Sequence, residues 1–283
     1  LAALAACALA ASTLAASAPA PASAAPGTPG VPSDPVVMYE EDFENTPDLD
    51  PVLLTAYRAA AGYAYTAHPD WLTECNGTII AAASPDAAAA AAGCPFAWDY
   101  VRTLAWAMGS FAGAADPMRN RVLSAYTENQ PAADLIQFET DGDLQLPTED
   151  RFVTFSVDAA ADSCHADHPL LEFTLLEGAS EFPLGSQIDP CTRPEAVDVL
   201  VPDITGVGET IIRVGRYATD DALLRTGTTI GIRMRNAQGS GFGNDMAIDN
   251  IRVIDVTPQL DVGFAPAAIT AGTPTTLTFT VTN

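Results

Sequence analysis

The sequence predicts a mainly β protein, an antiparallel jelly-roll-type β-sandwich with a small helical insert, followed by the first strands of a second sandwich. Three observations lead to this prediction. Segments of alternating apolar and polar residues recur between turn residues at short intervals. Helix-type segments lie only between about residues 52 and 110. Thr257-Pro258 interrupts the last alternating segment, and a new strand-rich segment begins directly after it.

The strand series begins at residues 37–44 and includes a short strand within 71–80. It continues, with turn residues between its members, at 122–127, 134–139, 151–157, 170–176, 210–217, 228–235 and 246–256. In one of these segments every second residue is apolar, namely Ile230, Ile232 and Met234, and the residues between them are Gly231 and Arg233. This alternation is typical of an antiparallel sheet with one buried and one solvated face. Seven or more such strands predict a jelly-roll sandwich.

The helical insert is predicted from two kinds of signal. Residues 52–63 are expected to form one or two helical turns, since Leu53, Leu54 and Tyr57 lie at helical spacing. Ser84 and the proline after it suit the start of a helix over 84–92. A second helix is expected over 100–108. The insert would cover a face or a rim of the sandwich.

The N-terminal segment predicts export. Residues 1–14 are small and apolar, and residues 22–24 (Ala-Ser-Ala) form a small-x-small cleavage site. Residues 1–24 are therefore interpreted as a truncated signal peptide, too short and too rich in alanine to span a membrane. Residues 25–37 are rich in Pro, Gly and Ser and predict a flexible leader. Since the chain does not begin with Met and stops within a strand pattern, it is expected to be part of a longer product.

The charge is strongly negative. The formal net charge is −24, and all 12 basic residues are arginine. A field of this sign repels nucleic acid and anionic membrane surfaces. It favours solubility and cation binding. The composition therefore excludes nucleic acid as a partner.

Four of the five cysteines lie after the predicted signal, at 75, 94, 164 and 191, with Cys7 inside it. An even number in an exported chain predicts disulfide bonds. Three pairings can be drawn, and the local one, Cys75–Cys94 with Cys164–Cys191, is favoured because it closes two loops of similar modest length. Each bond would stabilise the fold by roughly 3 kcal/mol. The cysteine and histidine spacings do not match a structural zinc site.

Two segments at opposite ends of the predicted sandwich carry a resemblance. Residues 39–44 (Tyr-Glu-Glu-Asp-Phe-Glu) and 244–253 (Asn-Asp-Met-Ala-Ile-Asp-Asn-Ile-Arg-Val) resemble the first and last strands of concanavalin-A-like and MAM-type jelly rolls of extracellular proteins. In such folds these two strands lie side by side. The resemblance implies that the segments around Phe43 and Ile248 pair and close the sandwich.

The C-terminal segment carries a second resemblance. Residues 257–283 resemble the opening of an Ig-like repeat that builds stalks in large surface proteins of Gram-positive bacteria, often ending in a sortase anchor. Residues 71–77 and 124–127 resemble parts of the N-terminal head of those proteins. The resemblance implies a location at the cell surface or cell wall, with attachment through downstream sequence. It implies no reaction.

Calcium is the one cofactor that the resemblance suggests. Carboxylates on the first and last strands of such jelly rolls often bind a structural Ca²⁺ ion, and the matching positions here are Glu41, Asp42, Glu44, Asp245 and Asp249. Ca²⁺ needs six to eight oxygen ligands, several of them carboxylates, gathered from distant segments. The alternative is a solvated acidic edge that deters edge-to-edge pairing.

Other motifs favour structural roles. His165 and His168 have metal-ligand spacing, but a neighbouring cysteine and Pro169 favour an exposed loop. Residues 239–243 (Gly-Ser-Gly-Phe-Gly) match no nucleophile or phosphate motif, which favours a hairpin turn, with backbone amides beside a ligand groove as the alternative. The Asn76-Gly-Thr sequon is expected to mark a tight turn.

No catalytic residue is predicted. Glycosidases need two carboxylates across a cleft, and residues 40–44 lack the spacing of a catalytic strand. The tryptophans, which could line a sugar-binding platform, lie in the insert, where packing is the default: Trp71, Trp98 and Trp106.

The predicted organisation is a head domain at 38–257 and an incomplete Ig-like repeat at 258–283. The predicted function is non-enzymatic: a secreted or cell-surface head domain for adhesion or surface architecture, mounted on a stalk of repeats. The alternatives are a lectin-like carbohydrate-binding module and an accessory piece of a degradative hydrolase. The expected partner is an extracellular ligand, either a glycan or a surface protein of a host or neighbouring cell.

Overall fold

The computed structural model describes residues 35–72, 75–86, 94, 97–127, 131–204, 206, 208–265, 272 and 274–282. The predicted signal (1–24), nearly all of the leader (25–37) and most of the helix predicted over 84–92 lie outside the described residues. The described chain belongs to two compact units, residues 34–258 and a second unit that includes 259–282. Each unit is described by itself.

The larger unit is an antiparallel β-sandwich, as the sequence predicts. Its nine-stranded sheet runs in the order β11-β12-β8-β15-β5-β4-β2, with β1 paired to β15 and β13 paired to β8. The bounds of these strands are β1 Val36–Glu41, β2 Val52–Leu53, β4 Thr78–Ala81, β5 Arg121–Ala125, β8 Arg151–Asp162, β11 Val197–Val201, β12 Thr210–Ala218, β13 Leu223–Arg225 and β15 Asp245–Asp255.

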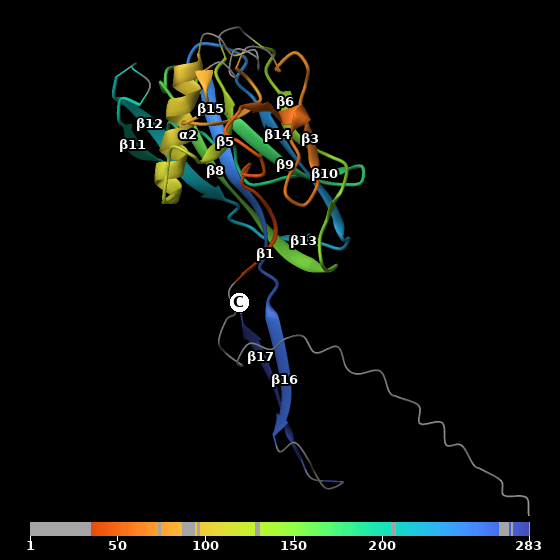
Figure 1. The fold of residues 1–283 in the computed structure, drawn as a ribbon. Coiled ribbons are helices and arrows are strands. Elements are labelled where there is room, and N and C mark those ends of the chain that lie inside the picture. Colours follow the sequence, from red (N-terminus) through yellow and green to blue (C-terminus); the bar gives the residue numbers. More distant parts are fainter. Residues whose placement is uncertain are drawn as a thin grey trace, which may run out of the picture. The chain divides into compact units, whose positions relative to one another are not determined.

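The second sheet packs against the first (Figure 1) and has the order β10-β9-β14-β6-β3, with β7 paired to β14. Its strands are β3 Ala64–Thr66, β6 Leu135–Asp141, β7 Leu144–Gln145, β9 Leu171–Glu177, β10 Ser180–Pro183 and β14 Thr229–Asn236. The chain passes between the two sheets several times. Neighbours within a sheet are therefore often distant in sequence.

The first and last strands of the sandwich lie side by side, which confirms the expected closure. β1 pairs antiparallel with the second half of β15, with Tyr39 opposite Val253 and Glu41 opposite Ile251. β5 pairs with the first half of β15, and β8 pairs with nearly all of it from the other side. β15 is thus a central strand over its whole length.

The core between the sheets is built by the alternating residues. In β14, Ile230, Ile232 and Met234 are fully buried, whereas Arg233 faces outward and forms ion pairs with Glu139 and Glu181. The predicted alternation of this strand is confirmed. Full burial of an aliphatic side chain contributes about 1.5–3 kcal/mol relative to its exposed state, so this face holds the sandwich together.

One carboxyl group lies inside the aromatic part of this core. Glu41 is buried, and its carboxylate accepts hydrogen bonds from the Tyr57 hydroxyl (2.9 Å), the Phe43 backbone N–H (2.7 Å) and the Tyr65 hydroxyl. Burial raises the pKa of Glu41, and the hydrogen bonds oppose that rise. A buried acid can persist here because each of its oxygens has a donor.

Helix α2 (Trp98–Ala112) covers the outer face of the nine-stranded sheet (Figure 1) and confirms the helix expected over 100–108. Its buried face includes Val101, Leu104 and Met108, which recur at helical spacing. It packs over small residues of the sheet, Ala160 and Ala247. Alanines on the strands allow the helix to approach the sheet closely.

The first part of the insert is less helical than expected. The described residues of 52–81 contribute β2, β3 and β4 to the two sheets, and the helix among them is one 3-10 turn, η1 (Leu54–Ala56). Leu54 and Tyr57 do share a buried face, but sheet pairing on either side stops the turn after three residues. The sequence-based expectation of a helix over 52–63 is therefore wrong, because tertiary pairing overrides a short periodic signal.

Both predicted disulfides are present. Cys75 is bonded to Cys94, and Cys164 is bonded to Cys191, which is the local pairing. No helix in the described part of the chain is long and apolar enough to cross a membrane.

The second unit contains a two-stranded antiparallel hairpin of β16 (Gln259–Ala265) and β17 (Thr276–Thr282). The strands expected at the C-terminus are thus formed. That they begin an Ig-like repeat stays a prediction.

Candidate ligand cleft

A cleft of about 340 Å³ opens at one end of the sandwich, and we call it the Phe242 cleft. Its lining comes from the segments after β5, after β8 and before β15: Tyr126, Thr127, Ser163, His165, Gly241, Phe242, Gly243 and Asp245. Since β15 lies between β5 and β8 and runs antiparallel to both, the ends of β5 and β8 meet the start of β15. Sheet topology therefore gathers three distant segments at this end.

The walls of the cleft are aromatic. Phe242 is 68% exposed and stacks on the His165 ring, with 4.8 Å between centroids and an interplanar angle of 18°. On the β5 side, Tyr126 stacks on Tyr100 of α2, with 5.1 Å between centroids and an angle of 26°. Several other large apolar side chains of this chain are also exposed; Phe242 differs from them because it lines the cleft and stacks on a second ring of its lining.

Hydrogen bonds within the loop hold Phe242 in place. The Asn236 side chain donates to the Asn244 carbonyl oxygen Oδ1 (2.7 Å), and Asn244 donates to the Gln238 backbone carbonyl (3.1 Å). The Phe242 backbone N–H donates to Ser240 Oγ (3.2 Å). Asn236 and Asn244 are buried, so this network fixes the loop from below and presents the phenyl ring outward.

Gly243 explains why this loop is rich in glycine. Its φ is +82°, and a Cβ there would lie 2.9 Å from the Cβ of His165. A larger residue would push the Phe242 loop away from the His165 loop. Residues 239–243 connect β14 of one sheet to β15 of the other, so the predicted hairpin turn is wrong. The segment borders the cleft, and the alternative, backbone amides that contact a ligand, stays a prediction.

The His165 loop is held in place by a disulfide bond and by contacts of the His168 ring. The Cys164–Cys191 disulfide lies next to His165, and the His168 ring contacts Asp189 Oδ2 at 3.0 Å and the His165 carbonyl at 2.7 Å. Burial works to raise the pKa of Asp189, but hydrogen bonds from Thr192 and His168 outweigh it and hold the pKa below its usual range. His168 is therefore a structural residue, and His165 is the one that faces the cleft.

Polar groups form the floor. Asp245 is buried and accepts a hydrogen bond from the Thr127 N–H (2.9 Å), while the Thr127 hydroxyl donates to the Asn76 side chain (3.0 Å). Asp162 lies opposite Asp245 on β8. Burial raises the pKa of Asp162. Hydrogen bonds from Ser163 oppose this rise, and so does the electrostatic effect of the nearby His165.

The five predicted calcium ligands lie at different places. Glu41 is in the core, Asp42 is exposed, and Asp245 is on the floor of the cleft. No three of them gather closely enough to hold a metal ion, nor does any other trio of His, Cys, Asp or Glu side chains within the described ranges. The calcium site stays a prediction.

The remaining two, Glu44 and Asp249, belong to a polar cluster at the bulge of β15. Glu44 accepts hydrogen bonds from the Arg121 backbone and forms an ion pair with its guanidinium (3.3 Å). Asp249 accepts from the side chain of Asn120 (3.1 Å). Burial raises the pKa of both carboxyls, and that of Asp249 well above its usual value.

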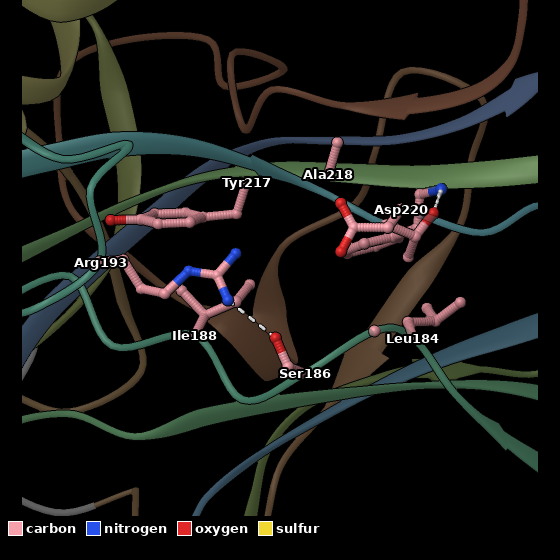
Figure 2. A pocket seen from close by; sticks show the side chains of 10 residues that line it. Leu184, Ser186, Ile188, Arg193, Tyr217, Ala218 and Asp220 are labelled. Carbon is pink, nitrogen blue, oxygen red and sulfur yellow. Dashed lines mark hydrogen bonds between the residues drawn. The ribbon is translucent and has the colours of Figure 1, made fainter.

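A second hollow, shown in Figure 2, lies between β12 and the loop that follows β10. The Tyr217 hydroxyl is buried there and has no hydrogen-bond partner among the described residues. Arg193 donates to Ser186 Oγ (2.8 Å), the contact dashed in Figure 2. The hollow has a volume of about 10 Å³, which holds no more than one water molecule, so the hollow is not a ligand site.

Two other sequence motifs lie away from any ligand surface. Trp71 and Trp98 are buried, which confirms that these two tryptophans pack in the core and do not line a sugar-binding surface. Asn76 is also buried, in a turn where Gly77 has a φ of +74°. The sequon therefore marks a turn, as expected.

Sequence reasoning placed the glycine-rich loop beside a groove as an alternative but did not find Tyr126, Thr127 or Phe242 as site residues. The available signal was an aromatic residue between two glycines, outside the alternating pattern of the next strand. Nothing local to residues 126–127 indicates that they meet residue 242.

Comparison with known proteins identifies no family. No protein-family model and no curated protein matches the sequence. Among solved structures, the sugar-binding C-terminal domain of EclA matches with 13% identity and a TM-score of 0.26, covering 47% of this chain and 76% of that one. The Caldicellulosiruptor saccharolyticus module CBM27-1, solved with mannohexaose, matches with 14% identity and a TM-score of 0.36, covering 78% and 97%. No residue role is transferred from either.

Proposed function

We propose that residues 35–258 form an exported, non-enzymatic carbohydrate-binding domain, and that the Phe242 cleft is its ligand site. The single observation that carries this proposal is the exposed, stacked Phe242 beside buried polar groups. One face of a pyranose ring is lined with C–H groups that stack on a flat aromatic ring, while its hydroxyls need hydrogen-bond partners. Phe242 offers the first, and Thr127, Ser163 and Asp245 offer the second.

The size of the cleft suits such a ligand. Small-molecule sites in proteins typically enclose about 300–1,000 Å³. At about 340 Å³, the Phe242 cleft lies at the lower end of that range. It accommodates one or two sugar rings more readily than a folded protein partner, which needs a broad surface.

Charge favours a neutral sugar. The residues that line the cleft include one carboxylate, Asp245, and no lysine or arginine. The formal net charge of the chain is −24. Anionic sugars such as uronates would meet a negative field and find no guanidinium or ammonium partner at the cleft, so we expect them to be excluded.

The arrangement of acids supports a binding role without catalysis. A glycosidase places its two carboxyl groups on opposite sides of the scissile bond. Asp162 and Asp245 instead lie side by side on adjacent strands. Asp162 is not among the residues that line the cleft, so the lining holds one carboxylate, Asp245, where a glycosidase needs two.

Two disulfides support export, since such bonds form and persist in oxidising compartments. In a domain built from two packed sheets, disulfide bonds also stabilise the folded state against unfolding outside the cell.

The test is glycan binding by residues 35–258 on an array of neutral and uronic-acid oligosaccharides. We expect binding to at least one neutral glycan, and loss of at least ten-fold in affinity for Phe242→Ala, since removing a stacked ring and the contacts around it costs about 1.4 kcal/mol or more. Phe152→Ala is the matched control, because Phe152 is also exposed (39%) and lies on β8 away from the cleft lining. Absence of binding to every glycan would refute the proposal.

A second candidate function, the head domain of a surface stalk, is favoured by the β16–β17 hairpin. The register places Leu260, Val262 and Phe264 opposite Val281, Phe279 and Leu277. The three side chains on β17 are exposed. An isolated two-stranded hairpin is at best marginally stable in water, so we propose that this apolar face belongs to an Ig-like repeat completed by further strands. Carbohydrate binding and a stalk are compatible in one adhesive protein.

A further inference from the structure

Resting on the proposed carbohydrate function, we infer that the ligand is an oligosaccharide of at least two sugars, with a second binding position on the Tyr126–Tyr100 pair. Tyr126 and Tyr100 form a second stacked pair of rings at the β5 side of the Phe242 cleft. The proposal therefore names the ligand class as a glycan chain, and a single sugar, which would occupy the Phe242 position alone, should bind more weakly.

The two aromatic pairs flank the same strand. Met246 of β15 pairs with Ala125 of β5 on one side and with Ala161 of β8 on the other. Tyr126 directly follows the first partner, and His165, on which Phe242 stacks, lies in the loop that begins after β8 ends at Asp162, the residue after the second partner. Strands separated by one intervening strand lie about 10 Å apart. This separation exceeds the width of one sugar ring and suits two linked rings.

Tyr100 extends the surface beyond the cleft. It lies in the first turn of α2, is 40% exposed and stacks on Tyr126. The buried face of α2 is formed by other residues, including Val101, Leu104 and Met108, so Tyr100 does little for core packing. A ring at this place lengthens the aromatic surface that starts with Tyr126.

Polar groups lie between the two aromatic positions. Thr127 follows Tyr126, and Asp245 begins β15 between the two flanking strands. A glycan that runs from Phe242 to Tyr100 would pass over both. Its hydroxyls would then meet polar groups along the path, and its C–H faces would meet rings at each end.

The experiment measures the affinity of residues 35–258 for β-1,4-linked glucose, mannose, xylose and N-acetylglucosamine, each as mono-, di-, tri- and hexasaccharide, by titration calorimetry. In a series that binds, we expect affinity to rise about ten-fold from the monosaccharide to the di- or trisaccharide and then to level off. Tyr100→Ala should remove most of this gain and leave monosaccharide binding unchanged. Tyr100→Phe, which keeps the ring, should behave like the wild type, and Phe242→Ala should weaken binding at every length.

The outcomes separate the two proposals. If sugars bind with an affinity that neither length nor Tyr100→Ala changes, the second position is refuted while the carbohydrate function stands. If no sugar binds, the carbohydrate function itself fails. If the Tyr100→Ala variant is unstable, Tyr100→Leu takes its place, because leucine keeps an apolar side chain but lacks the flat ring. An oligosaccharide affinity that is unchanged in Tyr100→Leu also refutes the second position.

Discussion

Gly243 meets two structural requirements at one position. It provides a φ of +82° for the turn, and it leaves room for the Cβ of His165. Substitution by alanine would be strained and would also separate two walls of the cleft. From the sequence alone, this glycine can be recognised as a turn residue, but its contact with residue 165 cannot.

Buried acids at the residue scale make stability depend on pH. Burial is the main cause that raises the pKa of Glu41, Glu44, Asp162 and Asp249 in the folded protein. The folded state then holds protons that the unfolded state has already released. These groups therefore contribute most below their unfolded pKa values, near 4, and the contribution is lost as pH rises through the folded values.

We predict that the melting temperature is higher at about pH 5 than at about pH 7.5 by a few degrees, since about 1 kcal/mol corresponds to roughly 2–4 °C in a domain of this size. Asp249→Asn should reduce the difference between the two pH values, because Asp249 is buried and its charge is disfavoured. Asp143→Asn, at an exposed position, removes the same charge from the surface and serves as control. Calorimetric scans at both pH values measure the effect; a Tm that rises toward pH 7.5 would contradict it.

The predicted calcium site is tested at the level of its residues. If the chain binds a structural Ca²⁺ through the predicted carboxylates (Glu41, Asp42, Glu44, Asp245 and Asp249), then EDTA should lower the melting temperature by several degrees and added Ca²⁺ should restore it, since a ligand that binds only the folded state stabilises it. An identical Tm with EDTA and with millimolar Ca²⁺ would remove the prediction.

Among the elements, most of the strands could be predicted because their alternation is local. β8, β9, β12, β14 and β15 each cover a segment that the sequence predicts as a strand. The strands that the sequence did not predict are short: β2, β3, β7, β10, β11 and β13. A strand of two to five residues has too little periodicity to detect, and it forms because a long neighbour offers it hydrogen bonds.

The Cys164–Cys191 loop is the element that links stability to binding. Replacing both cysteines by serine should lower the free energy of unfolding by roughly 3 kcal/mol and weaken glycan binding, since the loop holds His165 under Phe242. The Cys75→Ser/Cys94→Ser variant is the comparison. It should lose a similar amount of stability but less affinity, because Cys75 and Cys94 lie in the core under α2 and neither they nor the described residues next to them in sequence line the cleft.

Denaturant titration and glycan titration of both double variants give these two quantities. Equal loss of affinity in the two variants, at equal stability, would show that the His165 loop has no special part in binding.

For the whole molecule, the two compact units define what can be separated. The unit at 34–258 contains both sheets, both disulfides and the Phe242 cleft. We predict that residues 35–258 alone unfold cooperatively, with the same melting temperature as the chain 35–283 to within a few degrees, because residues 34–258 form a compact unit with its own hydrophobic core. Calorimetry of the two chains makes the comparison, and a shortened chain that fails to fold would show that the units depend on each other.

The sequence by itself determined the β class and favoured the local pairing of the cysteines, and the resemblance of two segments indicated that the first and last strands close the sandwich. Each of these follows from alternation, from loop length or from a segment motif that can be recognised without knowing what lies nearby. Only the tertiary structure decided that Phe242, His165 and Tyr126 share one cleft and that Glu41 lies in the core. These contacts join residues up to about a hundred positions apart through the order of strands in a sheet, and that order depends on the packing free energy of the whole domain.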